Sequence, residues 1–331
     1  MNPRDGVYAQ NLPLSDRSID LSAVVPPRPP IAPMKVAQFL LRAIDRLRWV
    51  ALRRTGARSL SVETAIGRVH ILDVPGTGRA PPVVLLHGLS SCGVDFRDFI
   101  EHLRPLTCRI VTADLPGHGW SDPPELGSQA GEVLEAVPEA LDRVLDGPAV
   151  VFGNSLGGLV ALRFALRRPE RVAGLVLSSP AGAPSHEDEL PALVASLRIT
   201  DSTSARDFVR RALPNAGTRG NLIAWAVRAR LGRPEIQALL DEAHAVALRP
   251  EELRSLTMPV LLLWGENERL LPASHLEFFR RHLPPSARIE VPPGWGHAPF
   301  LERPHAVAQR LRRFLAELDG SAESSGTADG Q

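Results

Sequence analysis

Several residue types that would define a protein class are scarce in this chain of 331 residues. Its two cysteines, Cys92 and Cys108, are too few for a disulfide framework, and no Cys/His spacing matches a structural zinc site. Basic and acidic residues number 38 and 37, so no excess of positive charge is available to bind nucleic acid. No apolar run is long enough to span a bilayer, and none resembles a secretory signal. We therefore expect a cytoplasmic protein that binds neither metal nor nucleic acid.

Proline and small polar residues dominate the two ends of the chain. Residues 1–33 contain seven prolines, which fix φ and remove hydrogen-bond donors, so this segment is expected to be a disordered arm. Residues 320–331 are mostly small and polar, and they are expected to form a disordered tail.

Residues 34–58 are expected to form an amphipathic basic helix between the arm and the core. The apolar residues at helical spacing are Val36, Leu40, Ala43, Leu47 and Val50, and the arginines fall mainly on the other side. In the simpler interpretation, this helix packs on the domain. In a second interpretation, residues 34–54 make peripheral contact with an anionic membrane surface, where such helices are known to lie.

The rest of the chain alternates short β-type runs with helical patterns. A hairpin is expected around Gly67, and continuous apolar runs bounded by Gly, Pro or Asp predict buried parallel strands. This alternation predicts an α/β fold with a mostly parallel, doubly wound sheet, built from residues 59–180 and 257–319. Residues 181–256 lack strand signals and are expected to form a helical insertion. The apolar runs are Val83–Leu86, Arg109–Ala113, Ala149–Phe152, Val172–Leu177, Val260–Trp264 and Arg288–Val291.

One segment, Gly153-Asn154-Ser155-Leu156-Gly157, follows an apolar run directly and opens a helical pattern. The two glycines permit a sharp turn, which would expose the Ser155 hydroxyl above the end of the strand. The N-terminus of the following helix favours developing negative charge there. We interpret Ser155 as a nucleophile. A phosphate-binding loop is excluded, because no lysine follows the glycines.

A serine hydroxyl is a weak nucleophile until a base takes its proton. His297 is the candidate base, because it follows Ser155 in the chain and lies in a glycine-rich loop before the last helical pattern. An acid that orients the imidazole should lie between them, just beyond a strand end. Glu266 and Glu268, after the apolar run at 260–264, are both candidates.

Acyl transfer also needs donors for the oxyanion that develops on the substrate. His87-Gly88-Leu89 follows the run at 83–86, where the second backbone donor of such a site is expected. We therefore predict that the oxyanion hole is formed by the backbone N–H groups of Leu89 and Leu156.

The chain resembles the α/β-hydrolase fold family over roughly residues 60–318. Four ordered motifs carry the resemblance: His87-Gly88, the run Asp114-Leu115-Pro116-Gly117-His118-Gly119, the turn at Ser155, and Gly296-His297. The resemblance implies that Asp114 and His118 are structural and that residues 181–256 form a helical cap over the substrate. The family commonly has an aspartate at the position of Glu268. The resemblance therefore implies that Glu268 is the acid of the site, with Glu266 as the fallback.

Within this family, the motifs are most similar to those of bacterial esterases and lipases with a Gly-Asn-Ser turn. Dehalogenases and epoxide hydrolases are excluded, since they use an aspartate nucleophile and the latter need cap tyrosines, whereas the only tyrosine is Tyr8. We expect hydrolysis of a small ester or lipid through an acyl-enzyme, without a cofactor. Cap residues are expected to help line an apolar acyl pocket: Leu190, Leu193, Leu197, Phe208, Leu222, Ile223 and Trp225.

Two kinds of alternative remain at this stage. The same three residues would serve a C–C bond or amide hydrolase. A relative that has lost turnover could instead act at a membrane surface or as a scaffold. The oligomeric state, the acyl chain length and the alcohol do not follow from the residues.

Overall fold

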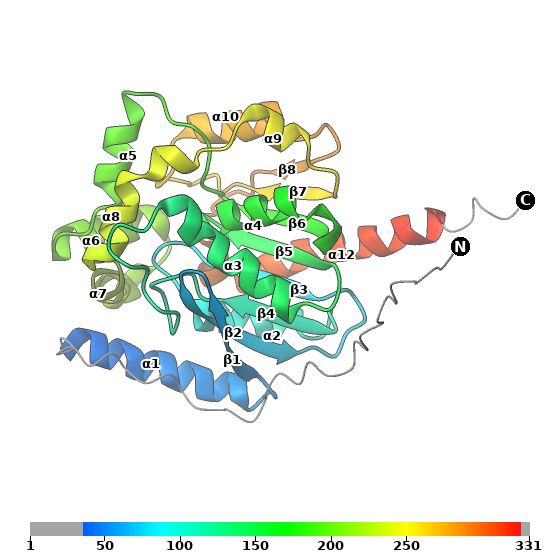
Figure 1. The fold of residues 1–331 in the computed structure, drawn as a ribbon, viewed down its shortest axis with the longest axis horizontal. Coiled ribbons are helices and arrows are strands. Elements are labelled where there is room, and N and C mark those ends of the chain that lie inside the picture. The colour runs from blue at the N-terminus through cyan, green and yellow to red at the C-terminus, as the bar shows by residue number, and fades with distance from the viewer. Residues whose placement is uncertain (1–35, 326–331) are drawn as a thin grey trace, which may run out of the picture.

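A computed structural model describes residues 36–325. The predicted arm at 1–33 and the last part of the predicted tail, 326–331, lie outside the described residues. Eight strands form a single sheet at the centre of the described chain (Figure 1). The strands are β1 (Arg58–Thr64), β2 (Gly67–Pro75), β3 (Val83–Leu86), β4 (Arg109–Ala113), β5 (Ala149–Asn154), β6 (Val172–Ser178), β7 (Val260–Leu263) and β8 (Arg288–Glu290).

The strand order is β1-β2-β4-β3-β5-β6-β7-β8. β1 and β2 form an antiparallel hairpin, and β2 also pairs antiparallel with β4. All pairings from β4 through β3 to β8 are parallel. The predicted mostly parallel α/β sheet is therefore confirmed. β3 and β4 agree with their predicted apolar runs residue for residue.

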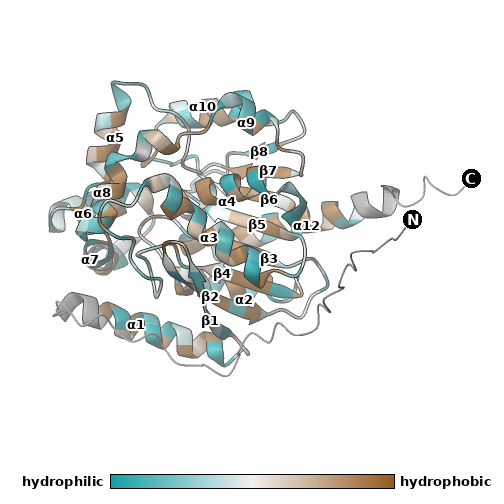
Figure 2. Cartoon of the chain, in the orientation of Figure 1, coloured by the Kyte–Doolittle hydropathy of each residue, from teal (hydrophilic) through white to brown (hydrophobic). Residues whose placement is uncertain are grey.

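The central strands are apolar on both faces (Figure 2). In β3, Val83 and Leu85 pack on one side of the sheet, and Val84 and Leu86 pack on the other. Helices cover both faces, as burial of both sides requires. The helices around the sheet are α1 (Val36–Arg53), α2 (Arg97–Leu103), α3 (Ala130–Val144), α4 (Leu156–Arg167), α10 (Ala273–His282), α11 (Pro299–Glu302) and α12 (Pro304–Ser325).

The chain between β6 and β7 is helical, as the absence of strand signals at 181–256 predicts. We refer to this insertion as the cap. Its α-helices are α5 (Glu189–Leu197), α6 (Ser202–Ala212), α7 (Gly220–Leu231), α8 (Pro234–Asp241) and α9 (Pro250–Arg254). Short 3₁₀ helices are η1 (Gly93–Phe96) and η2 (Pro169–Arg171) in the core, and η3 (Gly217–Arg219) and η4 (Ala243–Val246) in the cap.

Two element ends differ from the expectation. The sequence predicts the first helix over 34–58, but α1 ends at Arg53 and Arg58 already belongs to β1. Gly56 has a φ of 89°, a left-handed conformation that interrupts a helix. The tail was expected from residue 320, but α12 continues to Ser325, because one glycine at 320 lowers helix propensity without ending the helix.

The first helix packs on the domain, with α7 and η1 as its neighbours. Its inward side chains are Leu41, Asp45 and Leu52, which are all buried. The part of the predicted apolar stripe from residue 43 onward faces the other way, since the Leu47 side chain is 71% exposed and that of Val50 is 46% exposed. The sequence pattern could not separate these two sides, because both contain apolar residues. No helix in the described range 36–325 is long and apolar enough to cross a membrane.

Candidate active site

The candidate site residues lie at one edge of the sheet. Ser155 directly follows β5, and Leu89 comes shortly after β3. Glu268 and His297 lie in the loops after β7 and β8. Because these strands are parallel, their carboxyl ends meet at the same edge, which is where open α/β sheets place their ligands.

Ser155 occupies a strained turn between β5 and α4. Its φ is 54° and its ψ is −120°, a conformation rarely adopted by a residue other than glycine. A Cβ at Gly153 would lie 2.4 Å from the carbonyl oxygen of Gly157, and one at Gly157 would lie 2.3 Å from that of Leu86. Only glycine therefore fits at both positions, as the sharp-turn interpretation requires.

The neighbouring residue, Asn154, connects this turn to the histidine loop. Its Nδ2 donates to the carbonyl oxygen of Ser178 at 3.0 Å and to that of His297 at 2.8 Å. The backbone N–H of His297 donates in turn to the carbonyl oxygen of Ala212, at the end of the cap helix α6. Asn154 had no predicted role, because its burial and its two carbonyl partners are seen only in the folded chain.

The acid that reaches the histidine is Glu268. Its Oε2 lies 2.7 Å from Nδ1 of His297, and its Oε1 accepts hydrogen bonds from the backbone N–H groups of Leu270 at 2.7 Å and Leu271 at 3.1 Å. Burial alone would raise the pKa of the Glu268 carboxyl. The charge of His297 and these hydrogen bonds outweigh burial and lower that pKa below its ordinary value. The carboxylate is thus held ionised against the imidazole.

Glu266, the fallback acid, points elsewhere. Its side chain is exposed, and its Oε2 accepts a hydrogen bond from the backbone N–H of Gly294 at 2.9 Å. It braces the histidine loop without contacting the imidazole. The structure therefore brings Glu268, and not Glu266, to His297.

Three side chains hold the loop after β3 through the carbonyl oxygens of three consecutive residues. His87 Nδ1 donates to the oxygen of Gly88 at 2.8 Å, His118 contacts that of Leu89, and Arg230 Nη1 donates to that of Ser90 at 3.2 Å. His87 Nε2 accepts from a backbone N–H, so this ring is neutral. Because a trans peptide directs its N–H away from its C=O, the contact at Gly88 also sets the direction of the Leu89 N–H.

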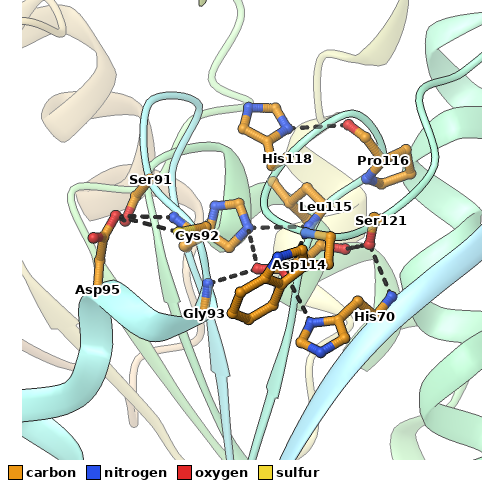
Figure 3. Close-up of polar contacts among 12 residues, drawn as sticks. His70, Ser91, Cys92, Gly93, Asp95, Asp114, Leu115, Pro116, His118 and Ser121 are labelled. Atoms are coloured by element: carbon orange, nitrogen blue, oxygen red, sulfur yellow. Dashed lines mark hydrogen bonds and ion pairs between the residues drawn. The ribbon is translucent and has the colours of Figure 1, made fainter. Parts of the chain in front are cut away.

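Asp114 ties β2, η1 and the turn at Trp120 together (Figure 3). It accepts hydrogen bonds from His70 Nδ1 of β2 at 2.8 Å, from the Gly93 N–H of η1 at 2.6 Å and from the Trp120 N–H at 3.1 Å. Burial alone would raise the pKa of Asp114, but the hydrogen bond and charge of His70 lower it to about 2. The geometry agrees with the expected structural role of Asp114.

Arg230 of the cap joins α7 to α1 and to the loop after β3. Its guanidinium lies 2.9 Å from Asp45 Oδ1, 2.7 Å from Asp95 Oδ2 and 3.2 Å from Cys92 Sγ. Among the described residues, Asp45, Cys92 and Asp95 form the one group close enough to suggest a metal site. Arg230 and Arg48 each pair with both Asp45 and Asp95, so two positive charges face the two carboxylates. Burial raises the pKa of the Cys92 thiol. We interpret the group as an ion-pair cluster. Sequence reasoning missed it, because its members are far apart in the chain.

A cavity of about 870 Å³ lies above this edge of the sheet. Ser155, His297, Leu89 and Leu156 all line it. Its walls are largely apolar and come from the cap and from α1, which contributes Leu41, Ile44 and Arg48. The cap apolar residues expected in an acyl pocket all line the cavity: Leu190, Leu193, Leu197, Phe208, Leu222, Ile223 and Trp225.

Comparison with known proteins agrees with this architecture. Residues 83–310 match the model of the alpha/beta hydrolase family. The chain is 33% identical to a pimeloyl-[acyl-carrier protein] methyl ester esterase of Nitrosomonas europaea over 246 residues, which are 70% of this chain and 95% of that protein. It is also similar to the crystal structure of a bacterial membrane phospholipase A, with a TM-score of 0.70 and 25% identity over 86% of this chain and 93% of that one. The crystal structure of carboxylesterase CesB of Bacillus subtilis is similar as well, with a TM-score of 0.67 and 25% identity. This match covers 84% of this chain and 98% of that one.

The chain therefore belongs to the α/β hydrolase family, as its motifs implied. Within that family it is an esterase-type enzyme, a carboxylic ester hydrolase.

The Asp114 network gives a stability prediction. The folded-state pKa of about 2 is below the ordinary value of 3.8, so ionised Asp114 stabilises the fold above about pH 4, and this contribution is lost as the pH falls toward 2. The shift corresponds to about 2 kcal/mol. Between about pH 6 and pH 2, the free energy of unfolding should decrease in both proteins. The decrease should be about 2 kcal/mol smaller in Asp114→Asn than in wild type, because the variant has no carboxylate to protonate at this position. Urea unfolding across this range measures it.

Asp146→Asn is the matched control, since the Asp146 side chain is 99% exposed. It should show the pH dependence of wild type. An Asp114→Asn curve parallel to that of wild type would contradict the proposed contribution of this carboxylate.

Proposed function

We propose that this enzyme hydrolyses carboxylic esters with Ser155 as nucleophile, His297 as general base and Glu268 as the acid that orients His297. The observation that carries the proposal is the 2.7 Å contact between His297 Nδ1 and Glu268 Oε2, in a loop that Asn154 ties to the strained turn at Ser155. The carboxylate holds the proton on Nδ1, which leaves Nε2 free to accept the serine proton.

The reaction proceeds in two halves. The Ser155 oxygen attacks the ester carbonyl while His297 takes its proton, and the tetrahedral intermediate then expels the alcohol, which receives that proton from His297. A water molecule next attacks the acyl-enzyme with His297 again as base, and the acid leaves as Ser155 regains its proton. The backbone N–H groups of Leu89 and Leu156 stabilise the oxyanion in both halves.

The cavity indicates the acyl side of the substrate. A volume of about 870 Å³ with apolar cap walls fits an extended acyl chain better than a small polar acyl group. The relative from Nitrosomonas europaea is named for a methyl ester of an acyl group carried on a protein. That name supports pimeloyl-[acyl-carrier protein] methyl ester as a second substrate to test, beside simple esters of medium-chain acids.

Replacing the proposed nucleophile tests the reaction itself. Ser155→Ala should lower kcat on p-nitrophenyl esters by at least about 10⁴-fold, because no acyl-enzyme can form. Wild type should prefer medium over acetyl chains, since only the former fill the apolar cavity. A Ser155→Ala enzyme that keeps more than a few per cent of wild-type turnover would rule out this mechanism.

The two glutamates provide a matched pair of variants. Glu268→Gln should lower kcat by about 10⁴-fold, because an amide does not hold the imidazole in the productive tautomer. Glu266→Gln, in the same loop, should stay within about twofold of wild type, because among the described residues the Glu266 side chain bonds only the Gly294 N–H. Steady-state kinetics on one ester measures both, and equal losses in the two variants would contradict the assignment of Glu268.

Arg230 is proposed to position the oxyanion loop through the Ser90 carbonyl. Arg230→Lys keeps the positive charge between Asp45 and Asp95, but it loses the forked geometry that also reaches Ser90. We expect kcat to fall about tenfold with KM nearly unchanged, because the Leu89 N–H acts on the transition state.

Arg228→Lys is the control for this variant. Arg228 lies on the same helix and is exposed, and its side chain bonds only Ser202 Oγ among the described residues. Its kcat should equal that of wild type. An Arg230→Lys enzyme in which KM rises and kcat does not change would assign Arg230 to substrate binding instead.

A further inference from the structure

The solvent-facing side of α1 is apolar. Six large apolar side chains are exposed in the described part of the chain, and only Leu47 and Val50 among them lie one helical turn apart. Ala43, one turn before Leu47, is exposed as well. These residues belong to the predicted stripe, and from residue 43 onward that stripe therefore points away from the domain instead of into it. An apolar stripe on the outside of a helix usually marks an interaction surface.

Exposed arginines lie beside Leu47 and at the C-terminal end of this stripe. Arg46, Arg53 and Arg54 are exposed, and none of them has a carboxylate partner among the described residues. The single acidic residue of α1, Asp45, faces the domain and is paired with Arg230. The whole chain is nearly neutral, so this surface is a local concentration of positive charge. We call Leu47, Val50, Arg46 and Arg53, together with Arg54 directly after the helix, the outer face of α1.

The same helix is one wall of the substrate cavity. Leu41, Ile44 and Arg48 line the cavity, and the outer face lies on another side of the same helix. Figure 1 shows α1 along one edge of the molecule, with the cap helices α6 and α7 above its first half. A helix is about 10 Å across, so an object bound to the outer face would lie only that far from the cavity lining.

Charge and shape favour a lipid surface as the object bound there. Anionic headgroups match the arginines, whose guanidinium groups bind phosphate oxygens, and the acyl region accepts the Leu47 and Val50 side chains. A second copy of the chain would bring like charges face to face across a two-fold axis, which disfavours self-association through this surface. The basic, apolar pattern with Asp45 turned inward is that of a helix lying in a membrane interface.

We propose that the outer face of α1 binds anionic lipid bilayers and holds the enzyme at the membrane surface, with its cavity wall next to the lipid. This contact is peripheral and does not depend on the identity of the ester substrate. It requires both parts of the surface, since the arginines attract the headgroups and the apolar pair enters the interface.

Vesicle flotation with the full-length chain tests the proposal. Wild type should float with vesicles of phosphatidylcholine containing phosphatidylglycerol, and much less with phosphatidylcholine alone. Two outer-face variants, Leu47→Ser/Val50→Ser and Arg46→Gln/Arg53→Gln/Arg54→Gln, should each lose at least about tenfold in bound fraction. Added salt should weaken binding of wild type, because it screens the arginines.

The matched control removes three arginines elsewhere: Arg281→Gln/Arg312→Gln/Arg313→Gln, on α10 and α12. It should float like wild type. All variants should hydrolyse a soluble p-nitrophenyl ester at the wild-type rate, because none of the replaced residues lines the cavity. This readout separates loss of lipid binding from misfolding and from any failure of the proposed ester chemistry.

Four results would overturn the proposal. The first two are wild type that does not float with the anionic vesicles, and outer-face variants that float as well as the control. Self-association in solution that Leu47→Ser/Val50→Ser abolishes, without flotation of wild type, would assign the surface to a second copy. Binding to an acidic protein without vesicle binding would assign it to a protein partner.

Discussion

The site depends on the strained turn at Ser155 and on the amide that secures it. A φ of 54° at Ser155 persists only because its surroundings hold it there, and Gly153 and Gly157 remove the atoms that would collide. Asn154 then bonds the carbonyl groups of both Ser178 and His297. The turn that exposes the proposed nucleophile and the loop that carries its proposed base are therefore held by one side chain.

Other contacts extend this frame outward from the sheet edge. Asp114 anchors the loop after β3, while Arg230 of the cap binds the same loop at Ser90 and pairs with Asp45 of α1. The His297 backbone is bonded to the end of α6 at Ala212. Cap and first helix thus do more than enclose the cavity, because each is connected to a loop that carries a proposed catalytic group. The first helix, α1, is therefore both part of this frame and the helix whose outer face we propose to bind lipid.

The sequence predicted the parts that depend on local patterns. Continuous apolar runs located the parallel strands, and the glycines around Ser155 located the turn, because both signals lie within a few adjacent residues. It could not choose between Glu266 and Glu268, which share one loop; the choice depends on a backbone turn that directs N–H groups of Leu270 and Leu271 at Glu268. The ion-pair cluster around Arg230 could not be predicted from local patterns, since Asp45 is 185 positions away from Arg230 in the chain. The sequence also could not show which side of α1 faces outward, because both sides of that helix carry apolar residues.

The central claim is that Ser155 is an activated nucleophile. Labelling of the native enzyme with a fluorophosphonate, followed by peptide mass mapping, tests it most directly, because an unactivated serine does not react. The account predicts one adduct per chain, on the peptide that contains Ser155, and no adduct after replacement of His297 by alanine. An unlabelled enzyme, or an adduct on another serine, would contradict it.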